Sequence, residues 1–149
     1  MLLMEVSEFI VKFYIKDYED KGIVELTQSP VCAISGVSEA DAADLKKAFN
    51  IETVEDLAIN KNLRLAQGIN CFSECEGQVL DKAFESQEFK NLANKPVSAI
   101  SGISENDAVL LDKAFGIKSI KDLAENKYVS IAQTTVAMAS LCQFLIIVD

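Results

Sequence analysis

The chain contains two copies of one segment, offset by 66 residues and aligned without a gap. Residues 30–58 read PVCAISGVSEADAADLKKAFNIETVEDLA, and residues 96–124 read PVSAISGISENDAVLLDKAFGIKSIKDLA. Of these 29 positions, 18 are identical. Self-similarity at a fixed offset indicates one supersecondary unit that occurs twice. The sequence therefore predicts a duplicated architecture, with a first repeat over residues 1–70 and a second over residues 71–149.

The predicted fold class is all-α, because apolar residues recur at helical spacing and strand signals are scarce. One apolar stripe precedes the repeated segment at Phe9, Ile10, Phe13 and Tyr14, and its counterpart in the second repeat is Val79, Leu80, Ala83 and Phe84. The sequence leaves open whether the two repeats share one core. It also leaves open whether the C-terminal run FLIIV is helical, extended or a contact between copies.

Helix starts are marked by Ser or Thr followed three residues later by an acid, which is the pattern of an N-terminal capping box. The pattern predicts N-caps at Ser38, Thr53, Ser104 and Ser119, with a further candidate at Ser73. Asn50 and Gly116 stand where the helices after Ser38 and Ser104 should end, because Asn and Gly tolerate a left-handed cap. Each repeat should therefore contain a short helix, a turn and two further helices.

The turn in each repeat has a recognisable pattern: an apolar residue, any residue, Gly, an apolar residue and a small one. It reads ISGVS at residues 34–38 and ISGIS at residues 100–104, and Ala42 and Ala108 follow four residues later. This pattern resembles the helix-hairpin-helix motif, and the resemblance covers about 29 residues of each copy. It implies that each repeat of about 66 residues is a small helical bundle similar to a SAM domain, with a helix-hairpin-helix-like corner.

The resemblance also implies a binding site at each turn. In that family, amides at the start of the second helix point at a nucleic-acid phosphate, an arrangement suited to a helix N-terminus. Such a contact reads the backbone and not the bases. The candidate ligand-binding residues are Gly36, Val37, Ser38, Glu39, Gly102, Ile103, Ser104 and Glu105.

Two departures from the family pattern weigh against phosphate binding. Ser38 and Ser104 replace a second Gly, and acids follow at Glu39 and Glu105, where Lys or Arg is usual in DNA-binding members. The net charge is −9, whereas phosphate affinity depends on positive charge that releases counterions. Three interpretations follow: each hairpin is a compact helical corner, a nucleic-acid contact that the charge disfavours, or a site for a protein ligand.

The sequence contains no His, which excludes His-based triads and most catalytic zinc sites. Cys71 and Cys75 are four residues apart on an expected helix and share one face. With Cys32 and Cys142 they are candidates for a four-thiolate metal site, but no CxxC pair exists and Cys32 aligns with Ser98. We therefore expect no enzymatic activity, no cofactor and no metal, with the thiols serving as packing residues.

A dense apolar run lies near the C-terminus. It includes Leu141, Phe144, Leu145, Ile146 and Ile147 as candidate interface residues. The run either covers the seam between the repeats or forms an exposed contact with a partner. It is shorter than a bilayer span and lacks adjacent basic residues, and the N-terminal MLLMEV has no signal-peptide character. The sequence thus predicts a cytoplasmic protein without membrane contact.

These features predict a non-enzymatic protein–protein interaction or scaffolding module, whose partner is another protein or a second copy of the chain. The alternative is sequence-nonspecific binding of a DNA or RNA backbone through the hairpin amides. A basic stripe on one face would favour the alternative. An apolar patch near the C-terminus would favour protein association.

Overall fold

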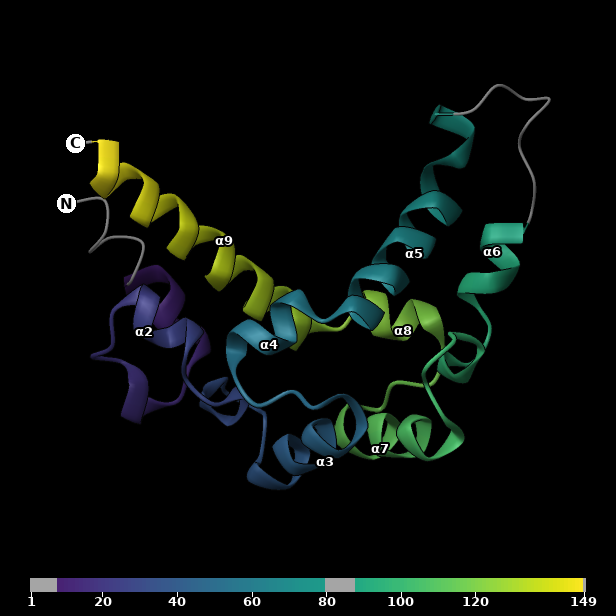
Figure 1. The fold of residues 1–149 in the computed structure, drawn as a ribbon, viewed down its shortest axis with the longest axis horizontal. Coiled ribbons are helices and arrows are strands. Elements are labelled where there is room, and N and C mark those ends of the chain that lie inside the picture. The colour runs from purple at the N-terminus through teal and green to yellow at the C-terminus, as the bar shows by residue number, and fades with distance from the viewer. Residues whose placement is uncertain (1–7, 80–87, 149) are drawn as a thin grey trace.

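A computed structural model describes residues 8–79 and 88–148, which are mostly helical and contain no strand (Figure 1). The α-helices are α2 Ile23–Thr27, α3 Glu39–Phe49, α4 Val54–Ile59, α5 Lys61–Val79, α6 Glu88–Ala93, α7 Glu105–Phe115, α8 Ile120–Ala124 and α9 Lys127–Val148. The 3₁₀ helices are η1 Val11–Phe13, η2 Lys16–Tyr18, η3 Val31–Ala33 and η5 Val97–Ala99. The all-α prediction is confirmed for these residues.

The helices that follow each turn begin and end where the sequence predicts. Capping boxes open α3, α4, α7 and α8, with Ser38, Thr53, Ser104 and Ser119 at the N-caps. Asn50 ends α3 at φ 57° and Gly116 ends α7 at φ 67°, both in the left-handed region. These short-range signals suffice because both partners of each cap lie within a few residues of each other.

The predicted N-cap at Ser73 is wrong, because Ser73 lies inside α5. Its hydroxyl donates to the carbonyl of Asn70 at 2.7 Å, so it satisfies itself within the helix. The predicted division after residue 70 also falls within this helix, which continues through Val79. The division into 1–70 and 71–149 stays a prediction.

The N-terminal apolar stripe is divided between the core and the surface. Ile10 and Tyr14 are buried, whereas Phe9 and Phe13 are exposed, because the chain leaves helical geometry and Tyr14 is extended. The Tyr14 hydroxyl lies 2.8 Å from the hydroxyl of Thr135 in α9. Burial raises the pKa of Tyr14, and the Thr135 contact acts in the opposite direction. The counterpart stripe from Val79 to Phe84 lies outside the described side chains.

The two halves of the chain exchange their long helices. α5, from the first half, packs against α6 and α8 of the second half. α9, from the second half, packs against α2 and α4 of the first half. Figure 1 shows α5 and α9 diverging from the middle of the molecule, while α3 and α7 lie side by side beneath them. Each half therefore completes the other.

Gln67 and Gln133 mark the point where the exchanged helices meet. Each side-chain Nε2 donates to the Oε1 of the other at 2.8 Å. The two residues are 66 positions apart, so equivalent positions of α5 and α9 contact each other. A reciprocal contact between equivalent residues is the local geometry of a two-fold axis. Such a contact is what an approximate two-fold axis between the two halves would produce.

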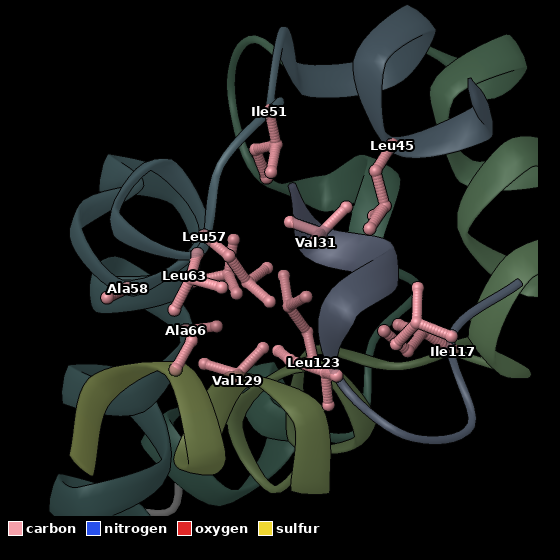
Figure 2. Close-up of a cluster of buried hydrophobic side chains, with 14 of the residues drawn as sticks. Val31, Leu45, Ile51, Leu57, Ala58, Leu63, Ala66, Ile117, Leu123 and Val129 are labelled. Atoms are coloured by element: carbon pink, nitrogen blue, oxygen red, sulfur yellow. The ribbon is translucent and has the colours of Figure 1, made fainter. Parts of the chain in front are cut away.

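The buried side chains of both halves form one hydrophobic cluster. Figure 2 shows Leu57, Leu63 and Ala66 of the first half beside Leu123 and Val129 of the second. The open question of one core or two is thus answered within the described residues. A shared core couples the stability of the halves, because neither half buries its apolar face alone.

Truncating the core in either half should destabilise the whole fold. Leu57 and Leu123 occupy equivalent positions and are each 1% exposed. We expect Leu57→Ala and Leu123→Ala each to lower the free energy of unfolding by about 3 kcal/mol, in a single transition. Urea unfolding monitored by circular dichroism and by tyrosine fluorescence measures this. Exposed Val109→Ala is the control, since Ala43 stands at the equivalent position. Two separate transitions in either variant would contradict the shared core.

The capping carboxylates of α4 and α8 should make stability depend on acidic pH. The backbone amides of Thr53 and Glu52 donate to the Asp56 carboxylate, and those of Ser119 and Lys118 donate to the Asp122 carboxylate. These bonds lower the pKa of each carboxyl group, and the bonds from Thr53 and Ser119 contribute most.

A folded pKa below the unfolded value stabilises the fold above about pH 4 and loses that effect as the pH falls through the folded pKa. We expect Asp56→Asn and Asp122→Asn to be less stable than wild type near about pH 7 and to approach it near about pH 2. Urea midpoints measured across this range test the expectation. An unchanged difference at both ends would contradict it.

Candidate functional site

The two hairpin turns have nearly identical backbones. Gly36 has φ 99° and Gly102 has φ 97°, a conformation that side-chain-bearing residues rarely adopt. Val37 and Ile103 are buried. Their backbone amides close a tight turn by donating to the carbonyl oxygens of Ile34 and Ile100 at 3.1 Å. The glycines thus supply the backbone conformation of the turns, and Val37 and Ile103 belong to the core, while ligand binding at these residues stays a prediction.

The amides at the start of α3 and α7 already have acceptors within the chain. The Asp41 amide donates to the Ser38 hydroxyl at 3.0 Å, and the Ser38 amide donates to the Asp41 carboxylate at 3.1 Å. Ser104 and Asp107 repeat this arrangement at the same distances. An acidic group therefore occupies the helix N-terminus that would otherwise attract an anion.

The two hairpins differ in what lies against them. Tyr128 of α9 lies over the first hairpin, and its hydroxyl is 3.4 Å from the Gly36 carbonyl oxygen. Its ring also packs against Phe115, with ring centroids 4.8 Å apart. Around Gly102, an added Cβ would meet no atom of the described residues within 4 Å. The first hairpin is therefore partly covered, and the second is open.

Sequence reasoning missed Tyr128. Its equivalent in the first repeat is Asn62, which is buried and begins α5 much as Tyr128 begins α9. The backbone amides of Asn62 and Tyr128 donate to the side-chain Oδ1 atoms of Asn60 and Asn126, respectively. The difference between Tyr and Asn lies outside the strongly repeated segment. Aligning the weakly repeated residues that follow each repeated segment would have identified this difference.

The predicted C-terminal interface residues lie on helix α9. Leu141 is 47% exposed and Phe144 is 60% exposed, while Leu145 is half-buried. The interpretation that this run covers the seam between repeats is therefore wrong for Leu141 and Phe144. The side chains of Ile146 and Ile147 lie outside the description. Because the run is helical, one side of it faces the core, as Cys142 does, and the other side faces solvent, as Leu141 and Phe144 do.

The exposed side of α9 forms a continuous uncharged stripe. It comprises Ser130, Thr134, Ala137, Leu141 and Phe144, which recur at helical spacing. We call these five residues the outer face of α9. No charged residue occurs between Tyr128 and Val148. The side chains of this stripe are small from Ser130 to Ala137 and bulky at Leu141 and Phe144.

A hollow borders the small half of the outer face. It has a volume of about 170 Å³, and its lining is mainly apolar. The lining residues are Phe9, Ile10, Phe13, Ser130, Ile131 and Thr134. The exposed rings of Phe9 and Phe13 therefore lie beside Ser130 and Thr134 of α9. This arrangement brings together segments that are more than a hundred residues apart in the sequence.

The four cysteines do not form a shared site. All four lie within the described residues and are free thiols, with Cys142 buried and Cys32 half-buried. No group of three or more metal-ligating side chains is assembled in the described part of the chain. Cys71 and Cys75 alone are close, with their Sγ atoms 3.5 Å apart. The contact with Cys71 raises the pKa of Cys75, with burial as the next cause.

Residues 120–145 are long and apolar enough to cross a membrane by length and composition alone. A core helix of a soluble protein can meet the same criterion when most of it is buried, whereas 28% of the apolar window in this segment is buried. The segment also joins α8 to α9 through a break at Glu125 and Asn126, which a continuous spanning helix would not contain. The expectations of a cytoplasmic location and of no membrane contact stay predictions.

Comparison of the chain with models of protein families, with curated proteins and with solved structures gives no match. The functional assignment therefore rests on the geometry of the hairpins and of α9.

Adding a methyl group at the two turn glycines should have unequal effects. A Cβ at Gly36 would lie 2.6 Å from the Tyr128 hydroxyl, whereas a Cβ at Gly102 is unobstructed. We expect Gly102→Ala to cost about 1–2 kcal/mol of backbone strain and Gly36→Ala to cost more. Chemical denaturation measures both. In a Tyr128→Ala background the two costs should become similar, and a persisting difference would show that Tyr128 does not cover the turn.

Proposed function

We propose that the protein is a non-enzymatic interaction module, built from two helix-hairpin-helix-like repeats, that associates with a second copy of itself. The contact surface is the outer face of α9. The observation that carries the proposal is the exposure of Leu141 and Phe144 on a helix face without charge. Large exposed apolar side chains that cluster on one face are typical of association surfaces.

The outer face is complementary to itself in size. Ser130 and Phe144 lie two helical turns before and after Ala137. An antiparallel pairing of two α9 helices about Ala137 therefore places the bulky half of each copy opposite the small half of the other. A symmetric dimer requires this kind of self-complementarity, because one surface serves both partners. A different protein would need no such match.

The hollow beside Ser130 supplies a receptor for Phe144. In the antiparallel pairing, Phe144 of one copy meets Ser130 of the other, which lines the hollow together with Phe9 and Phe13. The volume of about 170 Å³ exceeds the roughly 150 Å³ that suffices for a benzene ring. Aromatic side chains on both sides of the contact add favourable ring–ring interactions.

Electrostatics also favour α9 as the surface between copies. With a net charge of −9, two copies repel each other over most of their surfaces. The outer face of α9 carries no acid, so contact there brings the fewest like charges together. A basic partner would instead be attracted to acidic regions away from this face.

The capped hairpins fit this assignment as structural corners. Their helix-start amides bind Asp41 and Asp107, and Tyr128 covers the first turn. The alternative function, binding a nucleic-acid backbone, would depend on the second hairpin alone. A single acidic hairpin neutralises few phosphates, which makes the alternative the weaker proposal.

Replacing Phe144 should abolish self-association. We expect the wild-type chain to sediment as a dimer that dissociates on dilution, and Phe144→Glu to remain monomeric. Loss of a buried aromatic anchor typically costs about 2 kcal/mol or more of binding free energy. Analytical ultracentrifugation over a concentration series measures this, with circular dichroism to verify folding.

Two further variants make the test specific. Ser130→Leu fills the hollow and should also weaken the dimer, whereas Val109→Glu alters an exposed apolar residue on α7 and should leave it intact. A wild-type monomer at all concentrations would refute self-association, and a Phe144→Glu dimer would refute the outer face of α9 as its contact surface. In the same preparation, salt-sensitive anisotropy of labelled DNA that is lost in Gly102→Pro would instead support the nucleic-acid alternative.

A further inference from the structure

Cys71 and Cys75 form a pair of thiols on the surface of α5. Their Sγ atoms are 3.5 Å apart, Cys71 is exposed and Cys75 is half-buried. The equivalent positions in the second half are Ala137 and Leu141, so the pair occurs once. Neither thiol belongs to the shared core or to the outer face of α9. The packing of the fold therefore does not account for them.

We propose that Cys71 and Cys75 bind a soft, thiophilic metal ion as a two-thiolate chelate. Thiolate sulfur is the ligand that such ions prefer. On binding a divalent ion, each thiol loses its proton, two metal–sulfur bonds form and two protons pass to solvent. No electron is transferred in this step.

The sulfur–sulfur distance matches the bite of a metal centre. In a tetrahedral site with metal–sulfur bonds of about 2.3 Å, two sulfurs lie roughly 3.8 Å apart. The observed 3.5 Å differs from this by a few tenths of an ångström. Because both side chains reach the surface, small rotations close the gap without moving the backbone.

The same helix disfavours a disulfide between the two residues. Side chains at positions i and i+4 of a helix have Cβ atoms about 5–6 Å apart. A disulfide needs Cβ atoms about 3.5–4.5 Å apart, so its formation would distort α5. A bridging ion spans the wider separation. The geometry therefore selects metal chelation over oxidation.

Glu74 lies beside the thiols on the same side of the helix, three residues after Cys71 and next to Cys75. It is exposed, and its carboxylate accepts a hydrogen bond from Asn70 at 3.5 Å. An exposed carboxylate adds negative charge near the ion. Water completes the coordination, because the thiols face solvent.

Titration of the reduced, metal-free chain with Cd²⁺ tests the proposal. Cadmium–thiolate bonds give a charge-transfer absorption in the ultraviolet, which reports sulfur ligation directly. We expect saturation at one ion per chain, and an affinity at least about tenfold lower in Cys71→Ser and in Cys75→Ser. Cys32→Ser is the matched control and should bind as wild type does, since Ser98 already occupies the equivalent position.

Phenylarsine oxide provides a second measurement that depends on spacing. Its trivalent arsenic forms bonds to two neighbouring thiols and releases one water, which mass spectrometry detects as one adduct that blocks two alkylation sites. The wild-type and Cys32→Ser chains should give this adduct, and Cys71→Ser and Cys75→Ser should not. No charge-transfer band, equal effects of all three substitutions, or adducts independent of the pair would overturn the proposal. The Phe144→Glu variant should bind Cd²⁺ normally, which separates this site from self-association.

Discussion

The crossing of α5 and α9 at Gln67 and Gln133 is the constraint on which the rest of the structure depends. Each long helix leaves its own half at this point and supplies the apolar face that the other half lacks. Both side-chain amides are half-buried, and their mutual hydrogen bonds form only when both helices are in place. The crossing therefore ties one continuous core to one arrangement of the two halves.

The crossing also determines which surfaces are left for binding. The inner side of each long helix is occupied by the opposite half, which leaves its outer side for binding. The two outer sides have indeed diverged, because Cys71 and Cys75 of α5 stand where α9 has Ala137 and Leu141.

The sequence predicted the features that depend on neighbouring residues. The capping boxes, the left-handed ends at Asn50 and Gly116, and the turns at Gly36 and Gly102 all arise from interactions within a few positions. Contacts between distant segments were not predictable: Tyr128 on Gly36 joins residues 92 positions apart. Ser73 shows the converse error, since it carries a local helix-start signal but lies inside α5, which packs against α6 and α8.

The hairpins and the long helices thus differ in whether their interacting groups already have partners within the chain. At each hairpin, a serine and an aspartate satisfy each other's backbone amides, which stabilises the corner and leaves little for an external anion. On α9 the aromatic ring of Phe144 is exposed to solvent. Removing this apolar surface from water would lower the free energy. Burial of such side chains is a source of binding free energy, and this is why we propose the outer face of α9 as the contact surface.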